Sequence, residues 1–304
     1  MTRIRIRGGL SDRLLSWRIL SGARQTFVDI FTRGRKNGMV VTGFTIILVI
    51  TLLAVLSPWL PIAKPAALSP DELQGPSSSH WFGTDQLGRD VFSRVLWGAR
   101  ISLVVATLAI VFSLLIGVIM GLTAGYFGGT VDYLIAGTID LFWTFPAFLL
   151  ALAFAAALGP SLANVIIAIS ISYWAGFARL MRGQAFSVRE RLFVEASRAL
   201  GANNRRIMFT HVLPNSIAPL IVWASVGVAD AITIESSLSF LGAGTQPPTP
   251  SWGYMLHSGL DALHEAPWIS TFPGIVLLIT VLGFNLLGDG LRDVLDPRMK
   301  GLRR

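Results

Sequence analysis

The chain has 304 residues, of which 53% are hydrophobic and only 14% are charged. A soluble domain averages roughly 25% charged residues, so this composition argues against a soluble enzyme. Several apolar runs of about 18 residues or more instead predict a multi-pass membrane protein. The formal net charge is +8, and the absence of cysteine excludes both a disulfide framework and a cysteine-based metal site.

The N-terminal segment, residues 1–38, is polar and basic. Apolar residues are interleaved from about Ser11 to Thr32, which predicts an amphipathic helix on the membrane surface, with a tail lacking fixed structure as the alternative. The next segment, residues 39–60, is apolar and long enough to cross a hydrocarbon core about 30 Å thick. It is too long for the core of a signal peptide, so we expect a retained first transmembrane helix.

Residues 61–99 form a polar excursion whose first half is rich in proline and serine. From Leu87 onward, apolar residues recur at helical spacing and predict an amphipathic helix that leads into the second span. We expect this segment to lie on the outer, periplasmic side.

The segment 100–290 is predicted to hold five further spans. We expect them at Ile101–Ala124, Tyr133–Leu158, Leu162–Phe177, Ile217–Leu241 and Trp268–Leu287. Pro146 predicts a kink in the third span of the chain. Gly117, Gly121 and Gly125 are four residues apart and predict a close helix contact. The fold class is therefore an all-α membrane protein with six transmembrane helices, followed by a C-terminal tail at residues 291–304.

A basic island interrupts these spans at residues 179–215. Glu195 begins a short helical pattern, Gly201 allows the backbone to turn, and Pro214 marks the start of the next helix. The pattern predicts a helix, a glycine break and a second helix on one face of the membrane.

The positions of lysine and arginine set the orientation. Of the 25 basic residues, 21 lie in the N-terminal tail, in the 179–215 island or after Gly290. Cytoplasmic segments carry such an excess, so both termini and the island are predicted to be cytoplasmic. This distribution explains the basic character without nucleic acid, because no basic soluble domain is visible.

The island resembles the EAA loop in the membrane subunits of ABC importers. The family pattern is matched by Glu195-Ala196, Gly201 and the ending Leu213-Pro214, whereas Ser197 and His211 replace an alanine and an isoleucine. Segments around His80 and after Gly288 are similar to the C-type membrane subunit of dipeptide and oligopeptide importers. The resemblance implies a type I ABC importer permease fold with a cytoplasmic coupling helix.

The resemblance also implies partners. They are a homologous B-type permease subunit, two ABC ATPase subunits, an extracytoplasmic substrate-binding protein and the lipid bilayer of the inner membrane. ATP and magnesium would be bound by the ATPase subunits, and this chain would need no cofactor of its own. The residues implied in ATPase coupling are Glu195, Ala196, Ser197, Leu200, Gly201, Ala202, Asn203, Arg205 and Arg206. The outer loops Thr84–Asp90 and Gln246–Gly253 are candidates for contact with the binding protein.

Catalytic motifs are missing from the sequence. There is no phosphate-binding G-x-x-x-x-G-K-[ST] motif, no catalytic set emerges, and the four histidines are scattered. We therefore predict a non-catalytic transport subunit without a metal site.

Three acidic residues fall within predicted spans: Asp140, Asp230 and Glu235. Charge is expensive in hydrocarbon, so these residues either line a translocation pathway or make hydrogen-bonded helix contacts. Asp230 and Glu235 are five residues apart, about 140° around a helix, so both cannot face one cavity. The resemblance to dipeptide and oligopeptide importers implies that the cargo is a peptide. Nickel or a glutathione-like compound within the same family, and an ion-coupled secondary transporter using these acids, are the alternatives.

Overall fold

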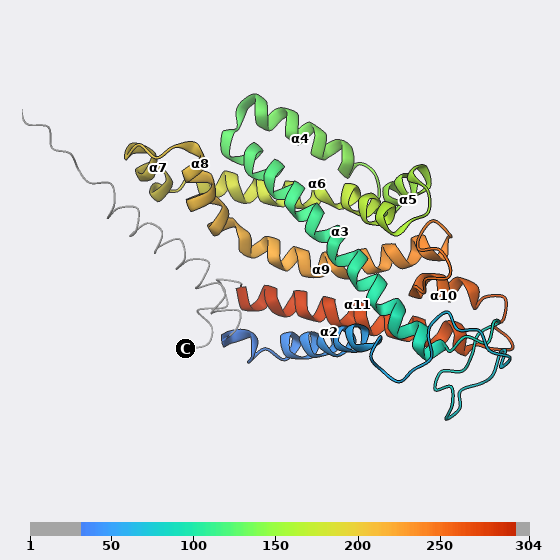
Figure 1. The fold of residues 1–304 in the computed structure, drawn as a ribbon. Coiled ribbons are helices and arrows are strands. Elements are labelled where there is room, and N and C mark those ends of the chain that lie inside the picture. The colour runs from blue at the N-terminus through green and yellow to red at the C-terminus, as the bar shows by residue number, and fades with distance from the viewer. Residues whose placement is uncertain (1–31, 296–304) are drawn as a thin grey trace, which may run out of the picture.

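A computed structural model describes residues 32–295 as an elongated bundle of helices (Figure 1). Across this range the regular elements are helical, and only an isolated β-bridge joins Thr84 to Asp90. Five of the described helices are long and apolar enough to cross a membrane, or six if one bent pair counts as a single span. The predicted multi-pass helical fold is confirmed. The predicted surface helix at residues 11–32 lies almost entirely outside the described residues.

The first span, α2 (Gly38–Leu56), begins where Asn37 Oδ1 accepts hydrogen bonds from the backbone N–H groups of Met39 and Val40. This cap satisfies donors that lack partners at a helix start. The helix has 19 residues and is therefore about 29 Å long. Its Gly43 packs against the backbone of Gly283 in α11 (Trp268–Leu295).

The second span is longer than predicted. Helix α3 (Val91–Phe127) runs for 37 residues without a break, so the expected outer amphipathic helix forms its first turns. Asp90 caps it by accepting a hydrogen bond from the Ser93 backbone N–H at 2.7 Å. A turn at Gly128 and Gly129, which both have positive φ, ends this helix.

The third predicted span is broken. Helices α4 (Gly129–Trp143) and α5 (Ala147–Leu158) meet at an angle of 86°. Pro146 lies between them in an extended conformation, with φ −55° and ψ 128°. Proline cannot donate a helical hydrogen bond and disfavours helix in the residue before it, so the expected kink is a full break.

The central contact of the bundle joins α3 to α6 (Leu162–Arg189). A Cβ at Gly117 would lie 2.4 Å from Phe177 Cβ, and one at Gly121 would lie 2.3 Å from the carbonyl oxygen of Ala178. The glycine face predicted from the four-residue spacing is confirmed, because only glycine permits this approach. Helix α6 extends past the expected end at Phe177 by three turns.

The last spans are α9 (Leu213–Phe240) and α11, which pack against each other. Helix α11 continues to Leu295, so the segment predicted as a tail from residue 291 begins as helix. Between them, α10 (Trp252–Ser258) packs on both α9 and α11 at the end of the bundle that also holds residues 57–90 (Figure 1).

Candidate coupling segment and membrane cavity

The island between α6 and α9 folds as a helix, a glycine break and a second helix. Helix α7 (Leu192–Ala199) carries Glu195 in its first turn, where negative charge suits the helix dipole. Gly201 follows with φ +82°, a conformation that side-chain-bearing residues rarely adopt. Asn203 Oδ1 then accepts a hydrogen bond from the Arg206 backbone N–H at 2.8 Å and caps α8 (Asn204–Ile207). The local structure predicted from sequence is confirmed.

The segment 192–207, called the α7–α8 segment below, is fixed to the bundle from one side. Val194 and Ile207 are fully buried in the main core. The Tyr126 hydroxyl of α3 donates a hydrogen bond to Asn204 Oδ1 at 2.9 Å. A π-helix, η1 (Met208–Val212), joins α8 directly to α9. These contacts mount the segment on the membrane helices rather than leaving it as a free loop.

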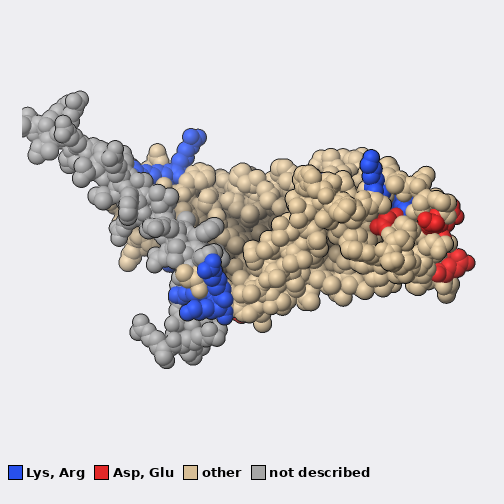
Figure 2. All heavy atoms as spheres, turned by 60° about the horizontal axis from the view of Figure 1, so that its bottom comes forward, with Lys and Arg blue, Asp and Glu red and all other residues tan. Residues whose placement is uncertain are grey.

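The opposite side of the α7–α8 segment is open. Leu192 is 81% exposed and Leu200 is 88% exposed, with Arg198 and Arg205 also at the surface. The segment projects from one end of the bundle (Figure 1), and that end carries most of the lysine and arginine visible in Figure 2. Single exposed leucines are ordinary, but two on one short, rigid projection form a surface suited to a partner.

The structure places all nine predicted coupling residues on this projection. Six are exposed: Glu195, Ala196, Leu200, Gly201, Asn203 and Arg205. The other three, Ser197, Ala202 and Arg206, are half-buried. None is enclosed in the core, so every one of them is available at or near the surface of the segment.

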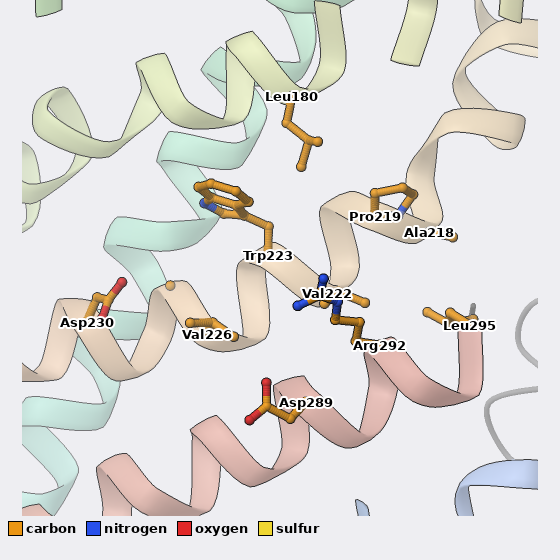
Figure 3. Close-up of a pocket in the computed structure, with 11 residues that line it drawn as sticks. Leu180, Ala218, Pro219, Val222, Trp223, Val226, Asp230, Asp289, Arg292 and Leu295 are labelled. Carbon is orange, nitrogen blue, oxygen red and sulfur yellow. The ribbon is translucent and has the colours of Figure 1, made fainter. Parts of the chain in front are cut away.

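A cavity of about 660 Å³ lies between α6, α9 and α11 (Figure 3). Asp230 lines it from α9, and Asp289 and Arg292 line it from α11. Most of the remaining lining is apolar and includes Trp223 and Leu180. Sequence reasoning singled out Asp230 but missed Asp289 and Arg292. Their spacing of three residues on an apolar helix was the available signal, because it puts both charges on one face.

The other two intramembrane acids lie elsewhere. Glu235 is fully buried and accepts hydrogen bonds from the hydroxyls of Ser102 at 2.7 Å and Ser239 at 2.9 Å. Asp140 on α4 forms an ion pair with Arg179 on α6 at 2.8 Å, and both side chains are more than half exposed. In this conformation only Asp230 of the three lines the cavity.

The loop Thr84–Asp90, predicted as a candidate for contact with a binding protein, is largely buried, although Leu87 is 49% exposed. Thr84, Asp85, Arg89 and Asp90 are all buried. Asp85 pairs with Arg89 at 2.7 Å and lies 3.5 Å from the buried Arg94. These contacts hold residues 85–89 against the start of α3. In the second expected loop, Gln246 and the two prolines after it are exposed, whereas residues 250–253 are buried.

Residues 113–301 match the profile of a protein family described as "Binding-protein-dependent transport system inner membrane component". The chain belongs to this family. It is therefore a membrane permease, a transport component and not a catalytic one. This agrees with its apolar helices and with the importer resemblance of its sequence.

Relatives of this permease have names that specify their cargo. The dipeptide transport system permease protein DppC of Alkalihalophilus pseudofirmus is 46% identical over 273 residues, covering 90% of each chain. The glutathione transport system permease protein GsiD of Pectobacterium atrosepticum is 41% identical over 267 residues, covering 88% of this chain and 89% of the relative. A putative peptide transport system permease protein of Brucella suis is 45% identical over 259 residues, covering 85% and 87%.

A solved structure supports the fold of this permease. A chain from inward-facing conformations of the MetNI methionine ABC transporter superposes with a TM-score of 0.53. The match covers 67% of this chain and 97% of that chain, at 17% sequence identity. The ABC importer permease fold expected from the sequence is thereby confirmed.

Proposed function

We propose that this permease carries short peptides across the inner membrane as one membrane subunit of an ATP-driven importer. A substrate-binding protein delivers the peptide at the outer end. Two relatives at 46% and 45% identity over most of the chain are named as dipeptide and peptide permeases, which favours peptides. A glutathione-like cargo is the second candidate, because a relative at 41% identity is named as a glutathione permease.

The α7–α8 segment is the proposed contact with an ATPase subunit. The observation that carries this role is the division of the segment into two sides. Val194 and Ile207 are buried in the bundle, whereas Leu192 and Leu200 project outward with no described residue covering them. A rigid projection that presents two exposed leucines is suited to docking into a groove of a partner. The predicted coupling residues from Glu195 to Arg206 lie on this projection.

The proposed orientation puts both termini and the α7–α8 segment in the cytoplasm, where ATP is available. Arginine is concentrated at this end of the bundle, whereas the exposed acids Asp71, Glu72, Asp261 and Glu265 lie in the segments at the opposite end (Figure 2). Cytoplasmic segments of membrane proteins carry excess lysine and arginine. A second, homologous permease subunit completes the pathway, and two ATPase subunits bind ATP and magnesium.

The short connections between the helices indicate how movement of the α7–α8 segment would reach the cavity. Helix α6 ends at Arg189 only three residues before α7, and η1 joins α8 to α9 without a loop. Displacement of the α7–α8 segment therefore moves α6 and α9, which are two walls of the cavity. ATP-driven closure of the ATPases would in this way change the side from which the cavity is open.

The test is peptide uptake by proteoliposomes that contain the permease pair, the ATPases and the binding protein. We expect uptake to require ATP hydrolysis and the binding protein. Leu192→Asp with Leu200→Asp should reduce uptake at least about tenfold and release the ATPase, because charge in an apolar contact costs several kcal/mol. Leu260→Asp, on an exposed leucine at the other end of the bundle, is the matched control. Uptake driven by an ion gradient without ATPase would refute the proposal.

A further inference from the structure

The charges in the cavity follow a simple pattern. Its lining is apolar except for Asp230, Asp289 and Arg292 (Figure 3). Within residues 32–295, none of these three side chains forms an ion pair with another residue. All three side chains are exposed rather than enclosed in the bundle, so a ligand in the cavity has access to their charges. Two acids and one arginine around one cavity, without ion-pair partners among the described residues, suit a ligand that carries charges of both signs.

The charges are spread along the cavity. Figure 3 shows Arg292 at the level of Val222 on α9, whereas Asp230 lies further along the same helix. Eight residues separate Val222 from Asp230, which corresponds to about 12 Å along a helix. Asp289 precedes Arg292 by three residues, or about 4.5 Å along α11. The cavity thus offers one cationic position and two anionic positions at different distances from it.

Free peptides of any sequence share only their backbone and two charged ends. An apolar wall with Trp223 and Val226 tolerates varied side chains, whereas fixed charges can recognise the ends. An extended chain advances about 3.3–3.6 Å per residue, so three or four residues span about 12 Å. The spacing of the charges therefore matches the dimensions of short peptides.

We propose that the cavity holds a peptide in transit by its two ends, with the α-carboxylate at Arg292 and the α-ammonium at an aspartate. Tripeptides and tetrapeptides reach Asp230, whereas a dipeptide reaches Asp289. The inference rests on the proposed function and adds the residues that would bind the cargo. Charge-assisted hydrogen bonds of this kind are stronger than hydrogen bonds between neutral groups, and one arginine can donate two of them to a carboxylate.

The test uses the complete importer in proteoliposomes and a pool of dialanine, trialanine and tetraalanine, with uptake of each measured by mass spectrometry. Arg292→Gln should lower uptake of all three about ten- to hundredfold. Asp230→Asn should lower uptake of the two longer peptides by a similar factor and spare the dipeptide. Asp289→Asn should lower uptake of the dipeptide and spare the two longer peptides. Asp293→Asn and Arg100→Gln are the matched controls, since both side chains are exposed and neither lines the cavity.

A second measurement uses the unaltered importer, so its result does not depend on whether the variants fold and assemble. Tripeptides with free ends carry a photoreactive leucine at either the first or the last position, and cross-linked residues are identified after illumination. The first position should label α9 near Val226 and Gly227, and the last should label Val222 and Leu295. Labels in the opposite order, or outside the cavity, would overturn the inference.

The outcomes separate this inference from the proposed function. If the unaltered importer takes up none of the peptides, the peptide-carrying function fails and the inference fails with it. If it takes them up and the three charge variants match it, only the inference is overturned. Equal losses for all peptide lengths in both aspartate variants would also contradict the two ammonium positions.

Discussion

Ser197 Oγ lies 3.2 Å from His211 Nε2, and this contact joins α7 to the π-helix η1. Both residues occupy positions at which the resembled importer pattern has apolar residues. The two departures therefore meet each other in space, although they are 14 positions apart in the sequence. A polar residue at either position alone would lack this hydrogen-bond partner, so each of the two departures satisfies the other.

The pair can be tested by replacing it with the residues of the family pattern. Ser197→Ala or His211→Ile alone should lower the free energy of unfolding by about 1 kcal/mol, because each leaves a half-buried polar partner without its hydrogen bond. The double substitution should cost less than the sum of the two. Thermal unfolding in detergent measures all four proteins. Strictly additive effects would show that the contact contributes nothing.

Added side-chain volume at the α3–α6 contact should lower stability strongly. Gly121→Val would place Cβ 2.3 Å from the Ala178 carbonyl oxygen, so the two helices must separate. We expect a loss of about 3 kcal/mol or failure to assemble, as in other overpacked cores. Gly183→Ala on α6 is the control, because nothing lies within 4 Å of the added Cβ. A wild-type melting temperature for the Gly121 variant would contradict the packing described here.

The glycine contact also shows what sequence can predict. The spacing of Gly117, Gly121 and Gly125 predicted a close helix contact because helical periodicity is local, and the same holds for the α7–α8 segment. The 86° angle between α4 and α5 could not be predicted, since proline indicates a break but not its direction. The shared cavity of Asp230, Asp289 and Arg292 depends on how α9 packs against α11, which no local pattern specifies.

The buried carboxyl group of Glu235 joins α9 to α3. Ser102 and Ser239 each donate a hydrogen bond to it, and Ser236 donates a longer one at 3.4 Å. Glu235→Ala should destabilise the protein by about 2–4 kcal/mol, because three hydroxyls lose their acceptor and a void remains. Glu235→Gln keeps one acceptor oxygen and should cost less.

Thermal unfolding of these variants in detergent is the measurement. Ser237→Ala serves as the control, since that hydroxyl is exposed and bonds only within its own helix. If Glu235→Ala has the same melting temperature as the unaltered protein, the carboxyl group has no structural role.

A two-point ion pair fixes α4 to α6 near the end that carries the α7–α8 segment. Arg182 Nε lies 2.5 Å from Asp132 Oδ1, and a second guanidinium nitrogen lies 2.7 Å from Asp132 Oδ2. Because the pair is partly exposed, solvent screening limits its contribution to about 1 kcal/mol. Arg182→Met should therefore speed hydrogen exchange in residues 129–143 without unfolding the bundle.

Two further variants make this prediction specific. Exchanging the partners, Asp132→Arg with Arg182→Asp, should restore part of the protection of α4. Glu190→Gln, which removes the exposed partner of Arg189, should leave α4 unchanged. If hydrogen exchange in α4 is faster in the double variant with swapped charges than in Arg182→Met, α4 depends on something other than this contact.

Gly201 allows the α7–α8 segment to turn. Its φ of +82° is unfavourable for residues with a Cβ, yet nothing lies within 4 Å of where that Cβ would be. The effect of Gly201→Ala is therefore backbone strain alone, about 1–2 kcal/mol. Gly201→Asn should cost less, because asparagine tolerates this region better than alanine. Gly137→Ala, within α4 and also in open space, should be neutral or stabilising.

Hydrogen exchange in residues 192–207 and ATP-driven uptake are the two measurements. An alanine variant that protects the segment as well as asparagine does would show that the turn does not need this backbone conformation, and equal uptake by both would show that coupling does not depend on it.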